Sequence, residues 1–498
     1  MSLSPISAQS SLTIQRLVDM RSQFDDLQRQ LSTGQKSSNY AGLGLNSGVT
    51  VSLNSQLSAI SGYSDTIANV GNRINLMNTA LSSMTDLETQ VKSALAQAPL
   101  GANGSGPPLA QQTGQNSLDQ LLGMLNTQAG GRYLFSGRAT DQPAVETLDH
   151  ILNGDGARAG LKQLISERTQ ADVGASGLGR LTIGSAGNIA TVSDDTSPFG
   201  FKLASVSSSL TNATVTGPSG SPATLSVDMS GGNPNDGDSL TVRLTLPDGS
   251  SENLTLTATS SATPGANQFS IGATPALTAA SLQAALTAAT GKLANTSLTA
   301  ASAVAASNDF FDADINNPPQ RVNGPPFDTA TGMVAGTAAN TVIWYTGDAG
   351  SGSARATATA RIDQSLVVSY GARANEDGIR TLVQNAATLA AVTVSPSNPN
   401  AADLSAALGQ RLTGNLSAPG VQTINDIETD LASAQVSLNA AKDRHQQTTA
   451  TLSDFLQQIE GVSNEDVGAQ ILALQTRMQA SMQTTAMLFQ TNLVNYLK

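Results

Sequence analysis

Both ends of this chain carry residues at alternating spacings of three and four that read as one helical face. Near the N-terminus the series consists of Leu3, Ile6, Ser10, Thr13, Leu17, Met20, Phe24, Leu27 and Leu31. Near the C-terminus it consists of Ile424, Ile427, Leu431, Ala434, Leu438, Ala441, His445, Thr448, Leu452, Phe455 and Ile459. A mean spacing of about 3.5 residues keeps one side of a helix facing a partner helix over many turns. The pattern therefore predicts long terminal helices that pack along narrow seams.

These seams are unusually polar for helices that pack in pairs. Ser10, Thr13 and Thr448 stand where a free-standing coiled coil would have Leu or Ile. The whole chain is also poor in large side chains, since only 3% of its 498 residues are aromatic. Small polar residues suit extended packing against neighbouring molecules better than one thick core. We therefore expect the terminal helices to be marginal alone and to become ordered when neighbours cover them.

The punctuation of the sequence divides each end into two helices. The first helix is predicted over residues 12–32, with Gly34 as its stop, and a loop is predicted over residues 40–48. A second helix is predicted over residues 50–97 and a closing helix after a break near Gly461. The second helix has the seam Ile60, Tyr63, Ile67, Val70, Ile74, Met77, Leu81, Met84 and Val91. The closing helix has the seam Val467, Ile471, Leu474, Met478, Thr485 and Leu488.

The middle of the chain has a different composition, rich in Ser, Thr, Gly and Pro from about Asp194 onward. Residues 239–259 alternate apolar and polar side chains on both sides of Asp248-Gly249, which predicts a β-hairpin. We therefore predict an α+β fold: long N- and C-terminal helices packed as a coiled-coil-like bundle, with an inserted, mainly β outer region. The predicted domains are a helical region 1–190, a β domain 191–305, a mixed segment 306–400 and a helical region 401–498.

Charge and residue usage disfavour most other functions. A net charge of −12 is unsuited to nucleic acid or anionic lipid, and no apolar run approaches the roughly 20 residues of a membrane span. The chain has no cysteine and two histidines, His150 and His445, which share no motif with other metal ligands. We interpret His445 as a polar seam residue and His150 as a surface residue. No catalytic site, cofactor or metal is expected, and the chain is predicted not to be an enzyme.

Two terminal segments resemble the bacterial flagellin family. Residues 27–39, LQRQLSTGQKSSN, are similar to the end of that family's first helix, where a leucine-rich helix meets Ser-Thr-Gly and a basic residue. Residues 473–498, ALQTRMQASMQTTAMLFQTNLVNYLK, are similar to its closing helix. The middle of the chain adds nothing to the resemblance, because that part varies within the family.

Within the family, the chain departs from filament subunits. The usual Asp-Asp-Ala-Ala-Gly-Leu segment is replaced by residues 39–45, NYAGLGL. Residues 131–137, GRYLFSG, and the ending LVNYLK resemble instead the members that form the junction between hook and filament. The stretches WYTGD, residues 344–348, and YGARANE, residues 370–376, are junction-like as well.

The resemblance implies a structural flagellar subunit, placed by these residues at the hook–filament junction, with filament flagellin as the alternative. It implies export in an unfolded form through the flagellar type III apparatus, without a cleaved signal peptide, and an extracellular location. The implied partners are other copies, other axial proteins, and the export apparatus or a chaperone, but neither nucleic acid nor membrane. The implied assembly interface consists of Thr13, Leu17, Phe24, Leu27, Leu474, Met478, Leu488 and Leu493. A more distant alternative, suggested by the Ser/Thr-rich middle, is a secreted adhesin or glycan-binding protein.

Overall fold

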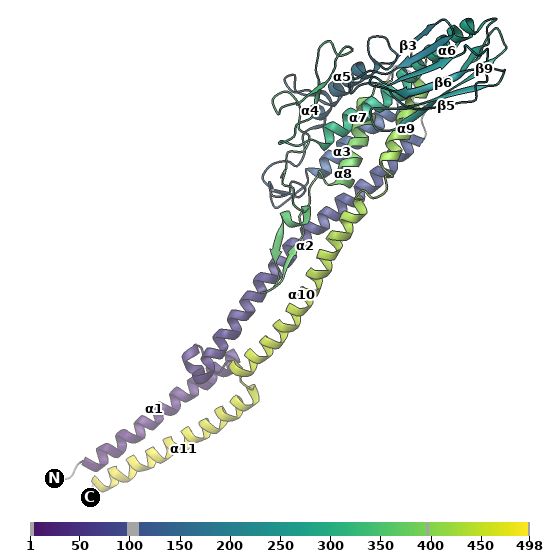
Figure 1. The fold of residues 1–498 in the computed structure, drawn as a ribbon. Coiled ribbons are helices and arrows are strands. Elements are labelled where there is room, and N and C mark those ends of the chain that lie inside the picture. Colours follow the sequence, from purple (N-terminus) through teal and green to yellow (C-terminus); the bar gives the residue numbers. More distant parts are fainter. Residues whose placement is uncertain (1–3, 97–108, 395–397, 497–498) are drawn as a thin grey trace. The chain divides into compact units, whose positions relative to one another are not determined.

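The computed structural model describes residues 4–96, 109–394 and 398–496, and the side chains of all of these except 4–10, 109, 488, 489 and 491–496. The fold is α+β, as predicted, with long terminal helices and a central β-rich region (Figure 1). The chain forms two compact units. The first consists of residues 1–71, 361–368 and 436–498, and the second of residues 72–360 and 369–435.

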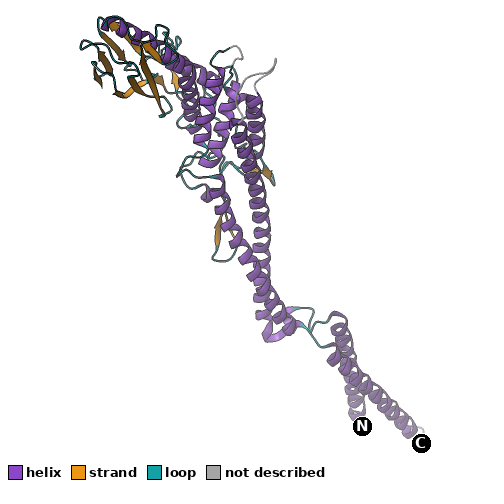
Figure 2. Cartoon of the chain, turned by 90° about the vertical axis from the view of Figure 1, so that its right-hand side faces the viewer, coloured by secondary structure: helices purple, strands orange, loops and turns teal. Residues whose placement is uncertain are grey.

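The first unit is built from helices at both ends of the chain. Helix α1 (Ser4–Thr33) packs against α11 (Asn464–Tyr496), and the two run antiparallel, side by side (Figure 2). A short 3₁₀ helix, η1 (Tyr40–Asn46), leads from α1 into α2 (Ser47–Ala96). Helix α10 (Ile424–Glu460) lies beside α2 in both views (Figures 1 and 2). Both α2 and α10 continue from the first unit into the second.

The predicted seams of α2 and α10 are buried over most of their length. Tertiary packing explains this order, since a helix of 50 residues with Gly62 and Gly71 in its interior has little support from propensity alone. On α2 the buried seam residues are Ile67, Val70, Ile74, Met77, Leu81, Met84 and Val91. On α10 they are Ile424, Ile427, Leu431, Ala434, Leu438, Ala441, His445 and Leu452.

The second unit combines a group of helices with two small sheets. Its helices beyond α2 and α10 pack in contacting pairs, α3 with α8, α5 with α7, and α7 with α9. Their bounds are α3 (Leu109–Leu125), α4 (Leu148–Asn153), α5 (Leu161–Val173), α7 (Thr299–Asp312), α8 (Asp377–Ala391) and α9 (Ala401–Asn415). Helix α6 (Pro275–Leu293) runs through a π-helical turn, η2 (Ala294–Leu298), into α7, and a 3₁₀ turn, η3 (Ala354–Thr357), precedes β13.

Two four-stranded sheets and α6 share one apolar core. The first has the order β10 (Gln268–Ser270), β9 (Ser251–Thr259), β8 (Ser239–Thr245) and β5 (Lys202–Ser208). The second has the order β3 (Thr182–Ala186), β4 (Ile189–Ser193), β7 (Thr224–Asp228) and β6 (Thr214–Ser219). The predicted hairpin is confirmed: β8 and β9 are antiparallel, with Ser239 opposite Thr257 and Thr245 opposite Ser251.

Some local predictions differ from the structure. The strands of the two four-stranded sheets begin at Thr182, before the change of composition, because β3 and β4 form a hairpin that extends the second sheet through β7. Residues 341–345 make isolated bridges at Thr341 and Tyr345. The remaining strands form short pairs: β1 (Gln128–Ala129) with β2 (Arg132–Tyr133), β11 (Arg321–Val322) with β12 (Met333–Val334), and β13 (Thr359–Arg361) with β14 (Val367–Ser369). The four domain boundaries stay predictions.

A buried carboxylate fastens α5 to the segment that leads into β5. Asp172 is fully buried and accepts hydrogen bonds from Nε of Arg168 at 2.7 Å and from the backbone N–H of Gly200 at 2.8 Å. Burial raises the pKa of Asp172, and Arg168 opposes that shift. The guanidinium of Arg168 also lies 5.4 Å from the centre of the Phe199 ring. The packing of a charged pair against an aromatic ring makes this junction specific.

Candidate assembly surface

The α1–α11 pair brings together most of the predicted interface residues. Thr13, Leu17, Phe24 and Leu27 follow the seam of α1 and are half-buried, while Leu474 is buried and Met478 half-buried on α11. The intermediate seam positions Met20, Ile471, Ser481 and Thr485 are half-buried as well. The side chains of Leu488 and Leu493 lie outside the described residues. The described members therefore form one continuous contact line within a single chain.

This contact line is only partly covered. Among the described seam side chains of α1 and α11, only Val467 and Leu474 fall below a tenth of their accessible area, at 3% and 6%. Six large apolar side chains of α1 and α11, called here the exposed apolar residues, lie outside the seam on several sides of the two helices and are exposed to between 50% and 65%: Leu12, Ile14, Val18, Leu472, Met482 and Met487. Burying apolar area contributes about 25 cal/mol of stabilising free energy per Å². Both the seam and the exposed apolar residues can therefore stabilise a contact with another molecule.

Three predicted seam positions are exposed. Leu31 is 41% exposed and Phe455 is 50% exposed, and Thr448 is exposed too, although the spacing assigned all three to packed positions. The α10 seam does not stop at Thr448, since Leu452 beyond it is buried.

A short clasp joins the end of α1 to the connection between α10 and α11. It consists of residues 34–36 and 460–462, with Gln35 and Gly461 paired as an antiparallel bridge. The backbone N–H of Lys36 donates to the carbonyl of Glu460 at 2.7 Å, and the N–H of Val462 donates to the carbonyl of Gly34 at 3.1 Å. The two ends of the chain are thereby hydrogen-bonded to each other where both long helices are interrupted.

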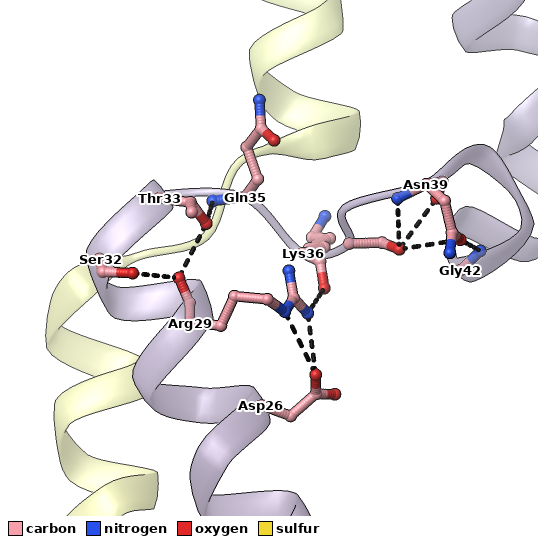
Figure 3. A network of polar contacts seen from close by, with 9 residues as sticks. Asp26, Arg29, Ser32, Thr33, Gln35, Lys36, Asn39 and Gly42 are labelled. Atoms are coloured by element: carbon pink, nitrogen blue, oxygen red, sulfur yellow. Dashed lines mark hydrogen bonds and ion pairs between the residues drawn. The ribbon is translucent and has the colours of Figure 1, made fainter.

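Side chains from the α1 end reinforce the clasp (Figure 3). Lys36 Nζ donates to the carbonyls of Gln458 at 3.2 Å and Ile459 at 3.0 Å, which are among the last carbonyls of α10 without a helical partner. A cation at this position also interacts favourably with the helix dipole. Arg29 is held by Asp26 at 3.0 Å and donates to the carbonyl of Lys36 at 3.4 Å. Lys36 is thus fixed through both its backbone and its side chain.

The segment after the clasp is more ordered than the sequence indicated. Residues 40–48 were expected to form a loop, but residues 40–46 form the 3₁₀ helix η1. Asn39 is the N-cap of η1, since its Oδ1 accepts the backbone N–H of Gly42 at 3.0 Å (Figure 3). A Cβ on Gly42 would stand 1.9 Å from Oγ of Ser37, so glycine is required for this close approach. The tip of η1 presents Leu45, which is fully exposed.

Within the described residues, no group of three or more His, Asp or Glu side chains is arranged to hold a metal ion. None of the described helices combines the length and apolar character that crossing a bilayer requires.

The first of these helices have a recognisable family pattern. Residues 7–140 match the bacterial flagellin N-terminal helical region. The match includes most of α1, the first half of the clasp, η1, α2, α3 and the β1–β2 hairpin. No curated protein matches the chain. The flagellin match covers the N-terminal side of the α1–α11 contact and the helix that continues into the second unit.

Sequence reasoning found the seams but not the clasp. The resemblance singled out Ser32-Thr33-Gly34-Gln35-Lys36, and Gly461 was recognised as a helix break. Pairing the two segments needs spatial information, because hundreds of residues separate them and neither has the alternation of a strand. The available signal was that both chain ends contain a helix stop between two long helices. One stop is Gly34-Gln35-Lys36 and the other is Gly461-Val462.

Proposed function

We propose that this protein is a structural subunit of the bacterial flagellum that assembles through its terminal helices. One observation supports this most strongly: the α1–α11 pair leaves its own seam half-covered and exposes further apolar side chains, among them Ile14, Val18 and Leu472. A helix pair with exposed apolar side chains is stabilised when neighbouring molecules cover them. The match of residues 7–140 to the bacterial flagellin N-terminal helical region supports the flagellar part of the proposal.

The proposed interface consists of the predicted residues, which make two kinds of contact. The contact between α1 and α11 within one chain involves Thr13, Leu17, Phe24, Leu27, Leu474 and Met478. The uncovered parts of these side chains, together with the exposed apolar residues, contact the neighbouring copy. Leu488 and Leu493 belong to the same proposal on the evidence of the sequence. A contact between unlike surfaces that does not close on itself generates a helical array, so one repeated interface can build a tube.

Within the flagellum, the proposed location is the hook–filament junction, occupied by hook-associated protein 3. The support is the resemblance of GRYLFSG and LVNYLK, together with the departure of residues 39–45 from filament subunits. The partners proposed on this basis are other copies of the chain, neighbouring axial proteins and the flagellar export apparatus or a chaperone. The protein is then extracellular and reaches its place by type III export.

Immunogold labelling of intact flagella tests both levels of the proposal. Antibodies raised against residues 182–298, the β-rich part, are applied to cells that carry hooks and filaments. Label confined to the boundary between hook and filament is the expected result. Label along the whole filament would replace the junction role with that of filament flagellin, and absence of label from all flagella would reject the flagellar role.

As a second readout, deletion of the gene is expected to leave hooks without filaments and flagellin monomers in the medium. Flagella of normal length in that strain would contradict the proposed location.

A further inference from the structure

His445 occupies an unusual position in the first unit. Its side chain is 6% exposed on the buried face of α10, and neither ring nitrogen has a hydrogen-bond partner. The ring lies against Tyr63 of α2, with 5.8 Å between the ring centres. A buried imidazole without hydrogen bonds is costly, because each desolvated donor or acceptor loses its bonds to water.

A carboxylate stands next to this ring. Oδ2 of Asp363, in the loop between β13 and β14, lies 3.5 Å from Nε2 of His445 and 3.4 Å from Nη2 of Arg444. The other oxygen of Asp363 accepts the backbone N–H of Gln364 at 2.7 Å. Oδ2 therefore faces the two basic side chains, while Oδ1 is used within the loop.

We infer that His445 is a proton-operated latch that fastens the loop of residues 361–368 to α10. When the ring takes up a proton, Nε2 becomes a charged donor directed at Asp363, and a small movement closes the remaining gap. When the ring is neutral, Nε2 carries no charge, and Arg444 is the charged group that holds the carboxylate. Arg444 is 52% exposed, so its ion pair is weakened by solvent.

The surroundings determine the direction of the effect. The charged and titratable groups that the structure places against His445 are Asp363 from the loop, Tyr63 from α2 and Arg444 from α10. The N–H of Gln364 lowers the pKa of Asp363, and Arg444 and His445 lower it further, so the carboxylate is charged throughout the range in which histidine titrates. Arg444 opposes a proton on the neighbouring ring, but Asp363 neutralises Arg444 as well.

The sign then follows from proton linkage. The latched form binds one proton more than the open form, so the latch strengthens as the pH falls and weakens as it rises. The lack of any hydrogen bond to the neutral ring makes Asp363 the decisive partner.

Hydrogen exchange on the full-length protein tests the latch. The amide of Ile362, a buried residue of the loop, donates to the carbonyl of Leu366 at 2.9 Å and reports on loop opening. Its protection factor is the intrinsic exchange rate at each pH divided by the observed rate. This factor is expected to rise roughly tenfold from about pH 8 to about pH 5.5. Because the chain has two histidines, proton NMR of the ring resonances follows His445 directly.

Two variants separate the latch from general effects of pH. Asp363→Asn removes the charge from a side chain that is 34% exposed and is expected to abolish the change in protection of Ile362. His150→Gln removes the other histidine, assigns the ring resonances and should leave the change intact. Protection that stays constant or falls on acidification would overturn the inference, as would full pH dependence in Asp363→Asn or failure of the His445 ring to titrate between about pH 5 and about pH 8.

Discussion

Leu472 and Leu474 are two residues apart on α11, yet the structure assigns them opposite environments. Leu474 is 6% exposed in the seam with α1, whereas Leu472 is 65% exposed and is one of the exposed apolar residues outside the seam. Replacing each by alanine removes the same atoms from the same helix. The pair therefore separates the contact inside one chain from the contact between chains.

The magnitudes follow from the area that each side chain buries. Leu→Ala deletes three carbon atoms, and at about 0.8 kcal/mol per buried methylene group Leu474→Ala costs the α1–α11 pair about 2.4 kcal/mol. Leu472→Ala, with about a third of its area covered, costs about 0.8 kcal/mol in the monomer, and the better helix propensity of alanine offsets part of this. When a neighbouring subunit covers Leu472, the remainder of the 2.4 kcal/mol is added to the cost.

Two assays on each variant give the comparison. In dilute monomer, limited proteolysis within residues 11–33 and 464–487 is expected to accelerate about fiftyfold in Leu474→Ala and less than fivefold in Leu472→Ala, the ratios that 2.4 and 0.8 kcal/mol represent. In assembled material, the critical concentration should rise in both. Equal proteolysis of the two monomers would show that the seam is not where the structure places it. Unchanged assembly of Leu472→Ala would show that Leu472 does not contribute to the interface between subunits.

Three further predictions concern the clasp, the helix η1 and the buried carboxylate. Lys36→Met keeps the apolar stem but loses the bonds to Gln458 and Ile459, and should lower the free energy of unfolding of the α10 terminus by about 0.5–1 kcal/mol by hydrogen exchange, whereas the exposed Lys442→Met should not. Gly42→Ala forces Ser37 to move and should lower the melting temperature, while Gly48→Ala, which meets no atom within 4 Å, should raise it slightly; the reverse order would contradict the η1 geometry. Burial raises the pKa of Asp172, so the native state binds its proton more tightly than the unfolded state and this group favours folding more as the pH falls. Urea titrations near pH 7 and pH 5 should therefore show that acidification favours folding less in Asp172→Asn than in the wild type, and an equal change in the two proteins would refute this.

The extent to which sequence predicted this structure depends on the range of the signal. The 3.5-residue spacing correctly placed Ile74, Leu81 and Leu438 in buried seams, because helical periodicity is a local property. The β8–β9 hairpin was likewise readable from alternation and Asp248-Gly249. The parallel pairing of β10 with β9 and the clasp were not predictable, since each depends on segments that approach only after folding.

The candidate surface shows the same division. Periodicity identified the line through Thr13, Leu17 and Leu474, but it could not distinguish a position covered by the chain itself from one left open. Phe455 was assigned to a packed position and is exposed, because the sequence does not say where the partner helix ends. His445 was correctly interpreted as a seam residue, while its proximity to Asp363 depends on a loop far away in the chain.

The attachment of the β-rich part has a consequence for what this protein can tolerate. That part leaves the helices after Val173 of α5 and returns at Thr299 of α7, and these two helices pack against each other. Ser302, next to the return point, is close enough to Asp172, next to the departure point, to lower the pKa of that carboxyl against the raising effect of burial. The two cut ends left by removing residues 174–298 therefore lie close enough for a short linker to join them. A replacement for this region must also pair with Arg411 of α9, because the buried side chain of Arg411 forms an ion pair with Asp248 in the turn between β8 and β9.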